Sequence, residues 1–185
     1  IVNIDGILKG YNTDMDGFLE PFKKKEIEII NKKILLLGAG GAARAIVAGF
    51  AKEKAKSITI ANRTLENAEK LSEFAGKIGL TADVLKIENV NESAKNYDII
   101  VNATSIGLKN EESVISLDGI NEKTVVYDIV YMPMNTDFIK KAKENNAIVI
   151  YGYEMLLGQA TRAFEIWHNM EAPYNTMKKA LLGGF

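Results

Sequence analysis

The sequence contains no cysteine, which excludes disulfides and thiolate metal sites. It also lacks any apolar run long enough for a membrane span or for the core of a signal peptide. An excess of one charge is missing too, because 23 basic and 24 acidic residues give a net charge of −1 and no basic stripe for nucleic acid. These absences predict a cytoplasmic protein that binds neither nucleic acid nor membranes.

What is present is enough apolar material for a core, since 47% of the 185 residues are hydrophobic. Strand-like and helix-like segments alternate along the chain. We expect strands at 34–37, 57–60, 81–87, 98–101, 125–128 and 148–150, and helices up to about residue 52 and at 65–74 and 136–143. Such alternation predicts an α/β fold, a Rossmann-type doubly wound parallel sheet with flanking helices. Residues 1–7 are predicted as one additional strand.

The strongest motif is a glycine-rich loop between a buried strand and a small-residue helix. Gly38 ends the strand, Gly40 holds the second position of the dinucleotide pattern, and Ala43 takes the third, where Ala can replace Gly. The first-turn N–H groups of the helix would face a pyrophosphate, and the helix dipole would favour that anion. The predicted cofactor-binding residues of this loop are Gly38, Ala39, Gly40, Gly41 and Ala42.

The end of the next strand favours NADP over NAD. Asn62, Arg63 and Thr64 stand where an NAD enzyme places a carboxylate for the ribose 2′-hydroxyl, and no carboxylate occurs before Glu66. An Arg guanidinium offers a fork of donors that matches a 2′-phosphate. Alternatively, Thr64 caps the next helix and Arg63 is a solvated charge. The two roles are compatible, and NADP is the predicted cofactor.

Two further segments are not needed by a nucleotide-binding sheet. Residues 10–18 lead into a helix, and Thr13 and Asp16 resemble a capping box, which would make Asp14 an ordinary first-turn carboxylate. In residues 152–167, one helical face carries an apolar stripe that we interpret as core or interdomain packing: Leu156, Ala160, Ala163, Phe164 and Trp167. Gln159 is the polar residue among them. His168, the only histidine, is expected at the surface.

Five motifs in order resemble those of the shikimate dehydrogenase family. They are Gly-Tyr-Asn-Thr-Asp-x-x-Gly-Phe at 10–18, Gly-Ala-Gly-Gly-Ala-Ala-Arg at 38–44, Asn-Arg-Thr at 62–64, Asn-Ala-Thr-Ser-x-Gly at 102–107 and Met-Leu-Leu-Gly-Gln-Ala at 155–160. The resemblance implies a reversible reduction of 3-dehydroshikimate to shikimate by NADPH, a step of aromatic amino-acid biosynthesis. The substrate implied is therefore a small molecule.

The resemblance also implies roles for three residues at the substrate. Asp14 matches a catalytic Asp that works beside a Lys, as a charged pair able to relay the hydroxyl proton during hydride transfer, and it contacts the substrate. Gln159 matches a Gln that hydrogen-bonds a substrate hydroxyl. Tyr131 matches a residue at the substrate or nicotinamide end of the cleft, although a role as a loop anchor is equally consistent with the sequence.

Three further cofactor contacts follow from the same resemblance. Thr104 and Gly107 lie in the loop after the fourth strand of the sheet, where the family passes its backbone close to the cofactor. Met155 matches a residue that packs near the nicotinamide, with an ordinary core Met as the alternative.

The family's substrate domain precedes the motif at 10–18 and supplies the catalytic Lys, and we find no such sequence here. We therefore expect 1–25 to be a linker strand and helix from a missing substrate domain, 26–152 to be the NADP-binding Rossmann domain, and 153–185 to be C-terminal helices that pack back toward the substrate domain. The chain is expected to bind NADP(H) but to catalyse poorly without that N-terminal domain in cis, and a homodimer stays open. The alternatives are a quinate/shikimate dehydrogenase that uses NAD and a non-catalytic nucleotide-sensing module.

Overall fold

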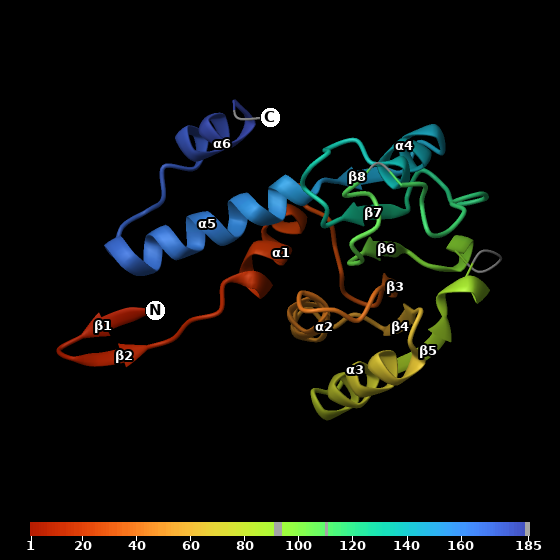
Figure 1. Ribbon diagram of the computed structural model, residues 1–185, viewed down its shortest axis with the longest axis horizontal. Helices are drawn as coiled ribbons and strands as arrows, with labels where there is room; N and C mark the ends of the chain where they lie inside the picture. Colours follow the sequence, from red (N-terminus) through yellow and green to blue (C-terminus); the bar gives the residue numbers. More distant parts are fainter. Residues whose placement is uncertain (91–93, 110, 184–185) are drawn as a thin grey trace.

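A single parallel sheet organises the computed structural model, which describes residues 1–90, 94–109 and 111–183 (Figure 1). Its strands are β3 (Lys33–Leu37), β4 (Ser57–Asn62), β5 (Ala82–Lys86), β6 (Ile99–Asn102), β7 (Val125–Asp128) and β8 (Ile148–Ile150). Their spatial order is β5-β4-β3-β6-β7-β8, and all neighbouring pairs are parallel. This is the strand order of a doubly wound dinucleotide-binding fold. The predicted fold class is confirmed.

Both faces of the sheet are buried, because its strands alternate between two apolar cores. In β3, Ile34 and Leu36 face one core, and Leu35 and Leu37 face the other. The first core is covered by α1 (Asp14–Lys24), α2 (Ala43–Lys52) and α3 (Leu65–Lys77), and the second by α4 (Asp137–Glu144) and the segment 114–120. Burial on both sides explains why the strands read as continuous apolar runs.

An aromatic cluster holds α1 on the sheet. The Phe18 ring stacks on the Tyr127 ring of β7, with centroids 5.0 Å apart and an interplanar angle of 6°. It also meets the edge of Phe50 from α2, with centroids 5.1 Å apart at 80°. All three side chains are fully buried, and each such aromatic contributes roughly 1.5–3 kcal/mol of burial free energy. The start of α1, which carries Asp14, is thereby fixed relative to the sheet.

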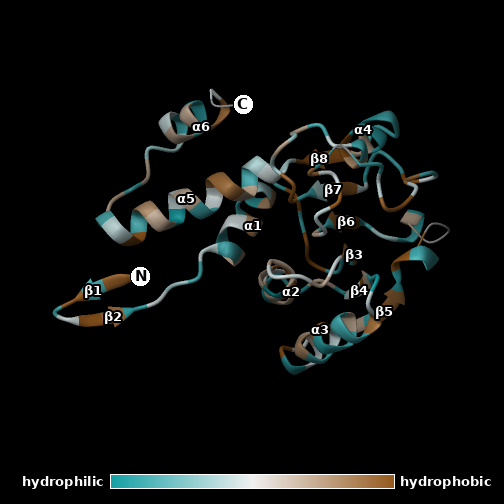
Figure 2. Ribbon diagram, viewed as in Figure 1, coloured by the Kyte–Doolittle hydropathy of each residue, from teal (hydrophilic) through white to brown (hydrophobic). Residues whose placement is uncertain are grey.

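The N-terminal residues form a hairpin, so the prediction of one strand over 1–7 is wrong. Strands β1 (Val2–Ile4) and β2 (Ile7–Lys9) pair antiparallel and project from the rest of the chain (Figure 1). Asp5 and Gly6 between them have φ values of 51° and 86°. An Asp-Gly pair readily adopts the positive φ angles of a two-residue hairpin turn, and this signal outweighs the apolar run. Both strands of the hairpin contain hydrophobic residues, drawn brown in Figure 2, and the side chains of Ile4, Ile7 and Leu8 are exposed.

The C-terminal part consists of α5 (Gly152–His168) and α6 (Tyr174–Leu182). The apolar stripe of α5 is not part of the described core, and Trp167 is 61% exposed. Of the two predicted roles, core packing is therefore wrong, and interdomain packing stays a prediction. The buried residues of α5 are instead Gly152, Met155, Leu157, Gly158 and Thr161. Three of the five are Gly or Thr, which hydrophobic periodicity does not identify. His168 is exposed, as expected. No helix of the described residues has the length and apolar character to cross a membrane.

Helices α1 and α5 cross at two glycines. A Cβ on Gly158 would lie 2.9 Å from the Cα of Gly17, and a Cβ on Gly17 would lie 2.6 Å from the backbone nitrogen of Gln159. Neither position has room for a side chain, so the two backbones are in direct contact. This contact sets the distance between Asp14, at the start of α1, and Gln159 on α5.

We predict that Gly158→Ala lowers the free energy of unfolding by about 1–3 kcal/mol, because the new methyl group must push α1 away from α5. Gly76→Ala in α3 is the matched control, because its Cβ would meet no atom within 4 Å and should stabilise by up to about 1 kcal/mol. Urea unfolding of both variants measures the difference. Equal effects at the two positions would contradict the close crossing.

Candidate functional site

A cleft of about 440 Å³ opens at the carboxyl ends of β3, β4 and β6. It lies where the strand order reverses, between β3 and β6, which is the position at which open α/β sheets bind ligands. The residues that line it are Gly38, Ala39, Gly40, Asn62, Arg63, Thr64, Asn67, Ile87, Ala103, Thr104, Ser105, Ile106 and Val114. The structure thus brings together the glycine-rich loop, the Asn-Arg-Thr motif and the loop after β6.

Gly38 sits at the point where two of these segments touch. Its φ is +100°, and a Cβ would lie 2.8 Å from the carbonyl oxygen of Ala103. Its N–H donates to the carbonyl oxygen of Ala61 (2.8 Å). The backbone conformation and the close approach therefore both require glycine at this position.

The start of α2 leaves space and donors for an anion. A Cβ on Gly40 or Gly41 would meet no atom within 4 Å, so the space beside the loop is open. Ala42, at the N-cap of α2, has no side chain that could accept a hydrogen bond from the first turn. First-turn N–H groups that no cap satisfies are suited to phosphate oxygens. The loop therefore fits the pyrophosphate of a dinucleotide.

The end of β4 contributes one cationic and two neutral polar residues to the cleft lining: Arg63, Asn62 and Thr64. The Asn62 side-chain amide donates to the carbonyl oxygen of Thr64 (2.8 Å) and so holds the turn. Arg63 is exposed at the cleft and forms no ion pair with any described residue. Thr64 occupies the N-cap position of α3, as one interpretation predicted, but its side chain accepts no capping hydrogen bond. No acidic residue is among those that line the cleft, so nothing there opposes a phosphate.

The loop after β6 is held by buried polar groups. The Asn102 side-chain oxygen accepts hydrogen bonds from both the N–H (3.1 Å) and the hydroxyl (2.7 Å) of Thr104, which lines the cleft. Gly107 turns away from it: its N–H donates to Glu111 Oε2 (2.9 Å), and a Cβ would lie 3.0 Å from Thr136 Cγ2. The φ of +107° at Gly107 also favours glycine. Packing of the loop thus accounts for this glycine.

Asp128 lies beneath the same loop, at the carboxyl end of β7, and is fully buried. Burial raises the pKa of its carboxyl group to about 6, against the lowering effect of hydrogen bonds from Thr136, Val130 and Asn102. No lysine or arginine of the described residues pairs with it within 4.0 Å. The carboxylate is therefore stabilised by hydrogen bonds alone.

A second group of predicted residues meets where α1 and α5 cross. The Gln159 side-chain amide donates to Asp14 Oδ1 (2.5 Å), and both side chains are half-buried. The N–H of Asp14 donates to Asn12 Oδ1 (2.8 Å). The suggested capping box is wrong, because the Thr13 side chain makes no capping hydrogen bond and Asn12 accepts from the backbone instead.

No lysine or arginine of the described residues lies within 4.0 Å of the Asp14 carboxylate. The ion pairs that join α1 or the residue after it to α5 are Asp16 with Arg162 (3.5 Å) and Lys25 with Glu154 (3.3 Å). Within the described ranges, Gln159 is thus the only hydrogen-bond or ion-pair partner of the Asp14 carboxylate.

The remaining predicted residues lie outside the cleft wall. The start of α5 abuts the loop after β7, because a Cβ on Gly152 would clash with the backbone of Val130. Gln159 lies about 10 Å further along this helix. Tyr131 is 45% exposed in the loop, whereas Met155 is buried in the core, as its alternative interpretation predicted. The cleft does not include these two residues or Asp14, Gln159, Gly41, Ala42 and Gly107.

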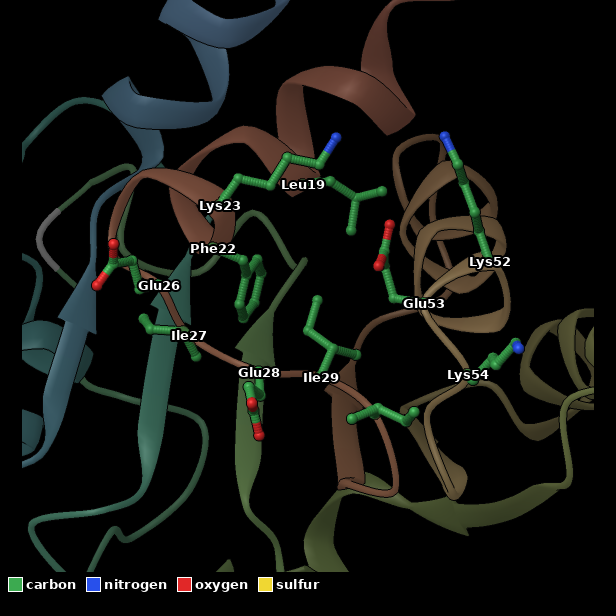
Figure 3. A pocket seen from close by; sticks show the side chains of 11 residues that line it. Leu19, Phe22, Lys23, Glu26, Ile27, Glu28, Ile29, Lys52, Glu53 and Lys54 are labelled. Atoms are coloured by element: carbon green, nitrogen blue, oxygen red, sulfur yellow. The ribbon is translucent and has the colours of Figure 1, made fainter.

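A larger hollow of about 530 Å³ lies between α1, the segment 26–30 and the end of α2 (Figure 3). Phe22, Ile27 and Ile29 form an apolar floor, and Lys23 and Lys52 point outward at its rim (Figure 3). It borders the end of α2 and the approach to β3, so it lies at the amino edge of the sheet, opposite the glycine-rich loop. The smaller cleft lies at the carboxyl edge of the sheet, beside the uncapped start of α2 and Arg63. This position favours the smaller cleft as the nucleotide site.

Six lining residues of the cleft were not predicted as site residues. Ala103, Ser105 and Ile106 belong to the predicted motif at 102–107, whereas Asn67, Ile87 and Val114 lie outside every predicted motif. These last three come from α3, from the turn after β5 and from the segment after β6, which meet only in the folded chain. Ile87 directly follows the carboxyl end of β5, and that position could have indicated it.

Comparison with known proteins agrees with these features. Residues 22–150 match the family model described as shikimate / quinate 5-dehydrogenase, and residues 152–182 match the shikimate 5′-dehydrogenase C-terminal domain. The chain is 77% identical over its whole length to a shikimate dehydrogenase (NADP(+)) of Nitrosopumilus maritimus, of which it covers 68%.

Two solved structures have the same fold. Shikimate 5-dehydrogenase from Listeria monocytogenes, in complex with shikimate and NAD, is 35% identical with a TM-score of 0.89, over 97% of this chain and 66% of that one. The 5-ketofructose reductase of a Gluconobacter strain is 33% identical with a TM-score of 0.89, over 98% and 66%. The chain thus spans about two thirds of the length of these relatives. By sequence and by fold, it belongs to the shikimate/quinate 5-dehydrogenase family.

Proposed function

We propose that this chain binds NADP(H) as the nucleotide-binding part of a shikimate dehydrogenase. The observation that carries the proposal is the cleft wall at the end of β4, where Arg63 stands without an acidic neighbour in the lining. A guanidinium there would bind the 2′-phosphate, and Asn62 and Thr64 would add neutral donors. The name of the Nitrosopumilus relative, which specifies NADP(+), supports the same cofactor.

The glycine-rich loop would hold the pyrophosphate of the cofactor. The loop before α2 is open beside Gly40 and Gly41, and no side chain caps the start of the helix, so first-turn N–H groups would be free to donate to phosphate oxygens. Thr104 would contact the dinucleotide from the loop after β6, and we assign Gly107 to the shape of that loop. When bound, NADPH supplies the hydride that is transferred to the substrate carbonyl.

We predict that Arg63→Ala weakens NADPH binding about 10- to 100-fold and leaves NADH binding within about twofold, because only NADPH carries the 2′-phosphate. Fluorescence titration of each nucleotide measures both affinities. Arg162→Ala is the control, since it removes the same charge from α5, where Arg162 pairs with Asp16 and does not line the cleft. An equal loss for both nucleotides, or tighter NADH binding by the unmodified chain, would contradict NADP as the cofactor and favour the NAD-dependent alternative.

We propose that Asp14 and Gln159 form the substrate end of the site. The reaction joins 3-dehydroshikimate, NADPH and a proton to give shikimate and NADP⁺, so a group at the carbonyl oxygen must handle one proton. Asp14 is held by Gln159 through one carboxylate oxygen, and its other oxygen is left for the substrate or for a Lys partner. The Gln159 carbonyl oxygen can accept from a substrate hydroxyl. Tyr131, exposed beside the start of α5, would line the entrance, with Met155 behind it.

We also propose the predicted division of the chain into a linker segment (1–25), a nucleotide-binding domain (26–152) and C-terminal helices (153–185). Residues 184 and 185 of the last segment lie outside the described residues. The first and third segments lie side by side, through the contact of α1 with α5. We propose that this pair of helices faces the substrate-binding part of the enzyme. The exposed apolar side chains of the hairpin and of α5, such as Ile7 (73%) and Trp167 (61%), are consistent with that arrangement.

We predict that residues 1–185 alone oxidise NADPH with 3-dehydroshikimate at a rate about 100-fold or more below that of the Nitrosopumilus relative, because no lysine or arginine of the described residues reaches Asp14. The loss of NADPH absorbance measures turnover. Comparable turnover would contradict the need for a further partner group.

The same assay distinguishes the enzyme from a nucleotide sensor. In a form of the protein that includes a substrate-binding part, Asp14→Asn should abolish turnover and leave NADPH affinity unchanged. A sensor would show no turnover to lose.

A further inference from the structure

Three buried polar side chains form a continuous network beneath the nucleotide cleft. Asn102 ends β6, Asp128 ends β7, and Thr136 precedes α4; their exposed fractions are 2%, 0% and 2%. Asn102 and Asp128 are opposite each other in the parallel register of the two strands. The network therefore lies at the carboxyl edge of the sheet, behind the loop that lines the cleft.

Asn102 holds this loop through both ends of its amide. Its oxygen accepts from the N–H and the hydroxyl of Thr104, and its nitrogen donates to the carbonyl oxygen of Ile106 (3.2 Å). The Thr104 hydroxyl oxygen in turn accepts from the Ile106 N–H (3.1 Å). One side chain thus fixes the conformation of residues 103–106, all of which line the cleft.

Asp128 determines which way the Asn102 amide points. Its Oδ1 accepts from the Asn102 amide nitrogen (2.9 Å) and from the N–H of Val130 (3.0 Å), and its Oδ2 accepts from the Thr136 hydroxyl (2.6 Å). If the amide were reversed, its oxygen would face the carboxylate and its nitrogen would face the Thr104 N–H. Both contacts would be unfavourable, so the acceptor at position 128 selects the orientation that holds the loop.

The fold alone does not require a carboxylate at this position. Burial disfavours its charged form, and among the described residues no cation compensates for that cost. Val126 in β7 and Val101 in β6 have apolar side chains that are fully buried. The contacts that distinguish Asp128 from those neighbours are its hydrogen bonds to Asn102, to the backbone after β7 and to Thr136.

We propose that Asp128 is a positioning residue of the nucleotide site: by orienting Asn102 it holds the loop 103–106 in the shape that receives the cofactor. This inference rests on the proposed binding of NADP(H) in the cleft. Asp128 itself does not line the cleft, so its effect on the nucleotide is indirect.

Hydrogen exchange of the unliganded 185-residue chain tests the positioning directly. Asp128→Ala removes the acceptor, so we expect at least about tenfold faster exchange of the Thr104 and Ile106 amides and about tenfold weaker NADPH binding. In Asp128→Asn, the side-chain oxygen can still accept from Asn102 and Val130, and the amide can donate to Thr136. We therefore expect exchange and affinity within about 1.5-fold of the original values. An Asp128→Asn variant as impaired as Asp128→Ala would overturn the proposal.

Leu80→Ala is the matched control for a general loss of stability. Leu80 is buried (2% exposed) before β5, at the amino edge of the sheet, away from the loop. It should lower the unfolding temperature without changing exchange at Thr104 and Ile106 or the affinity for NADPH. Equal effects of Leu80→Ala and Asp128→Ala on the loop, or no effect of Asp128→Ala, would contradict the positioning role.

Thr136→Val serves if Asp128→Ala does not fold, because it removes the hydrogen bond that fixes Oδ2 and, besides that, only the hydrogen bond from the Ile139 N–H at the start of α4. We then expect about threefold faster exchange at Thr104, and unchanged exchange there would overturn the proposal. The exchange experiment contains no nucleotide. If the unmodified chain failed to bind NADPH, the proposed function would fail while the control of the loop by Asp128 would still be measured.

Discussion

The nucleotide cleft depends on the close approach of two backbones at the carboxyl edge of the sheet. Gly38 packs against the carbonyl group of Ala103, and a Cβ would come within 2.8 Å of that oxygen. β3 and β6 are adjacent parallel strands where the strand order reverses, and the loops that follow them leave a cleft between them. The glycine-rich loop and the start of α2 form one side, and the loop held by Asn102 forms the other. The polar groups that face this cleft are those that a phosphorylated dinucleotide requires.

Much of the fold follows from the sequence, because the strands are buried on both faces and read as apolar runs between turn residues. The strand order also follows once the glycine-rich loop is placed after the first strand of the sheet. Where two short-range sequence signals favoured different local structures, the sequence alone did not show which of them prevails. Asp5 and Gly6 reverse the chain inside a run that suggests one strand, and Asn12 takes the hydrogen bond that a capping box would assign to Thr13. In α5 the apolar stripe lies outside the described core and ends in the exposed Trp167, whereas the close contact with α1 is made at the small Gly158.

In the candidate site, too, the sequence located some residues and not others. Motifs that act through local backbone geometry, such as the glycine-rich loop and Asn62–Thr64, can be located from the sequence and lie on the cleft wall. Contacts made between distant segments could not be located. The hydrogen bond between Gln159 and Asp14 joins residues far apart in the chain, and the side chains of Asn102 and Asp128 meet only through the register of two strands. The fold alone does not determine the substrate, since a relative with the same fold is a 5-ketofructose reductase.

The most direct test of the account is a crystal structure of this chain with NADP⁺. The account predicts the pyrophosphate against the first-turn N–H groups of α2, beside Gly40, and the 2′-phosphate within hydrogen-bond distance of the Arg63 guanidinium. A nucleotide bound instead in the larger hollow between α1 and α2, or a 2′-phosphate pointing away from Arg63, would contradict it.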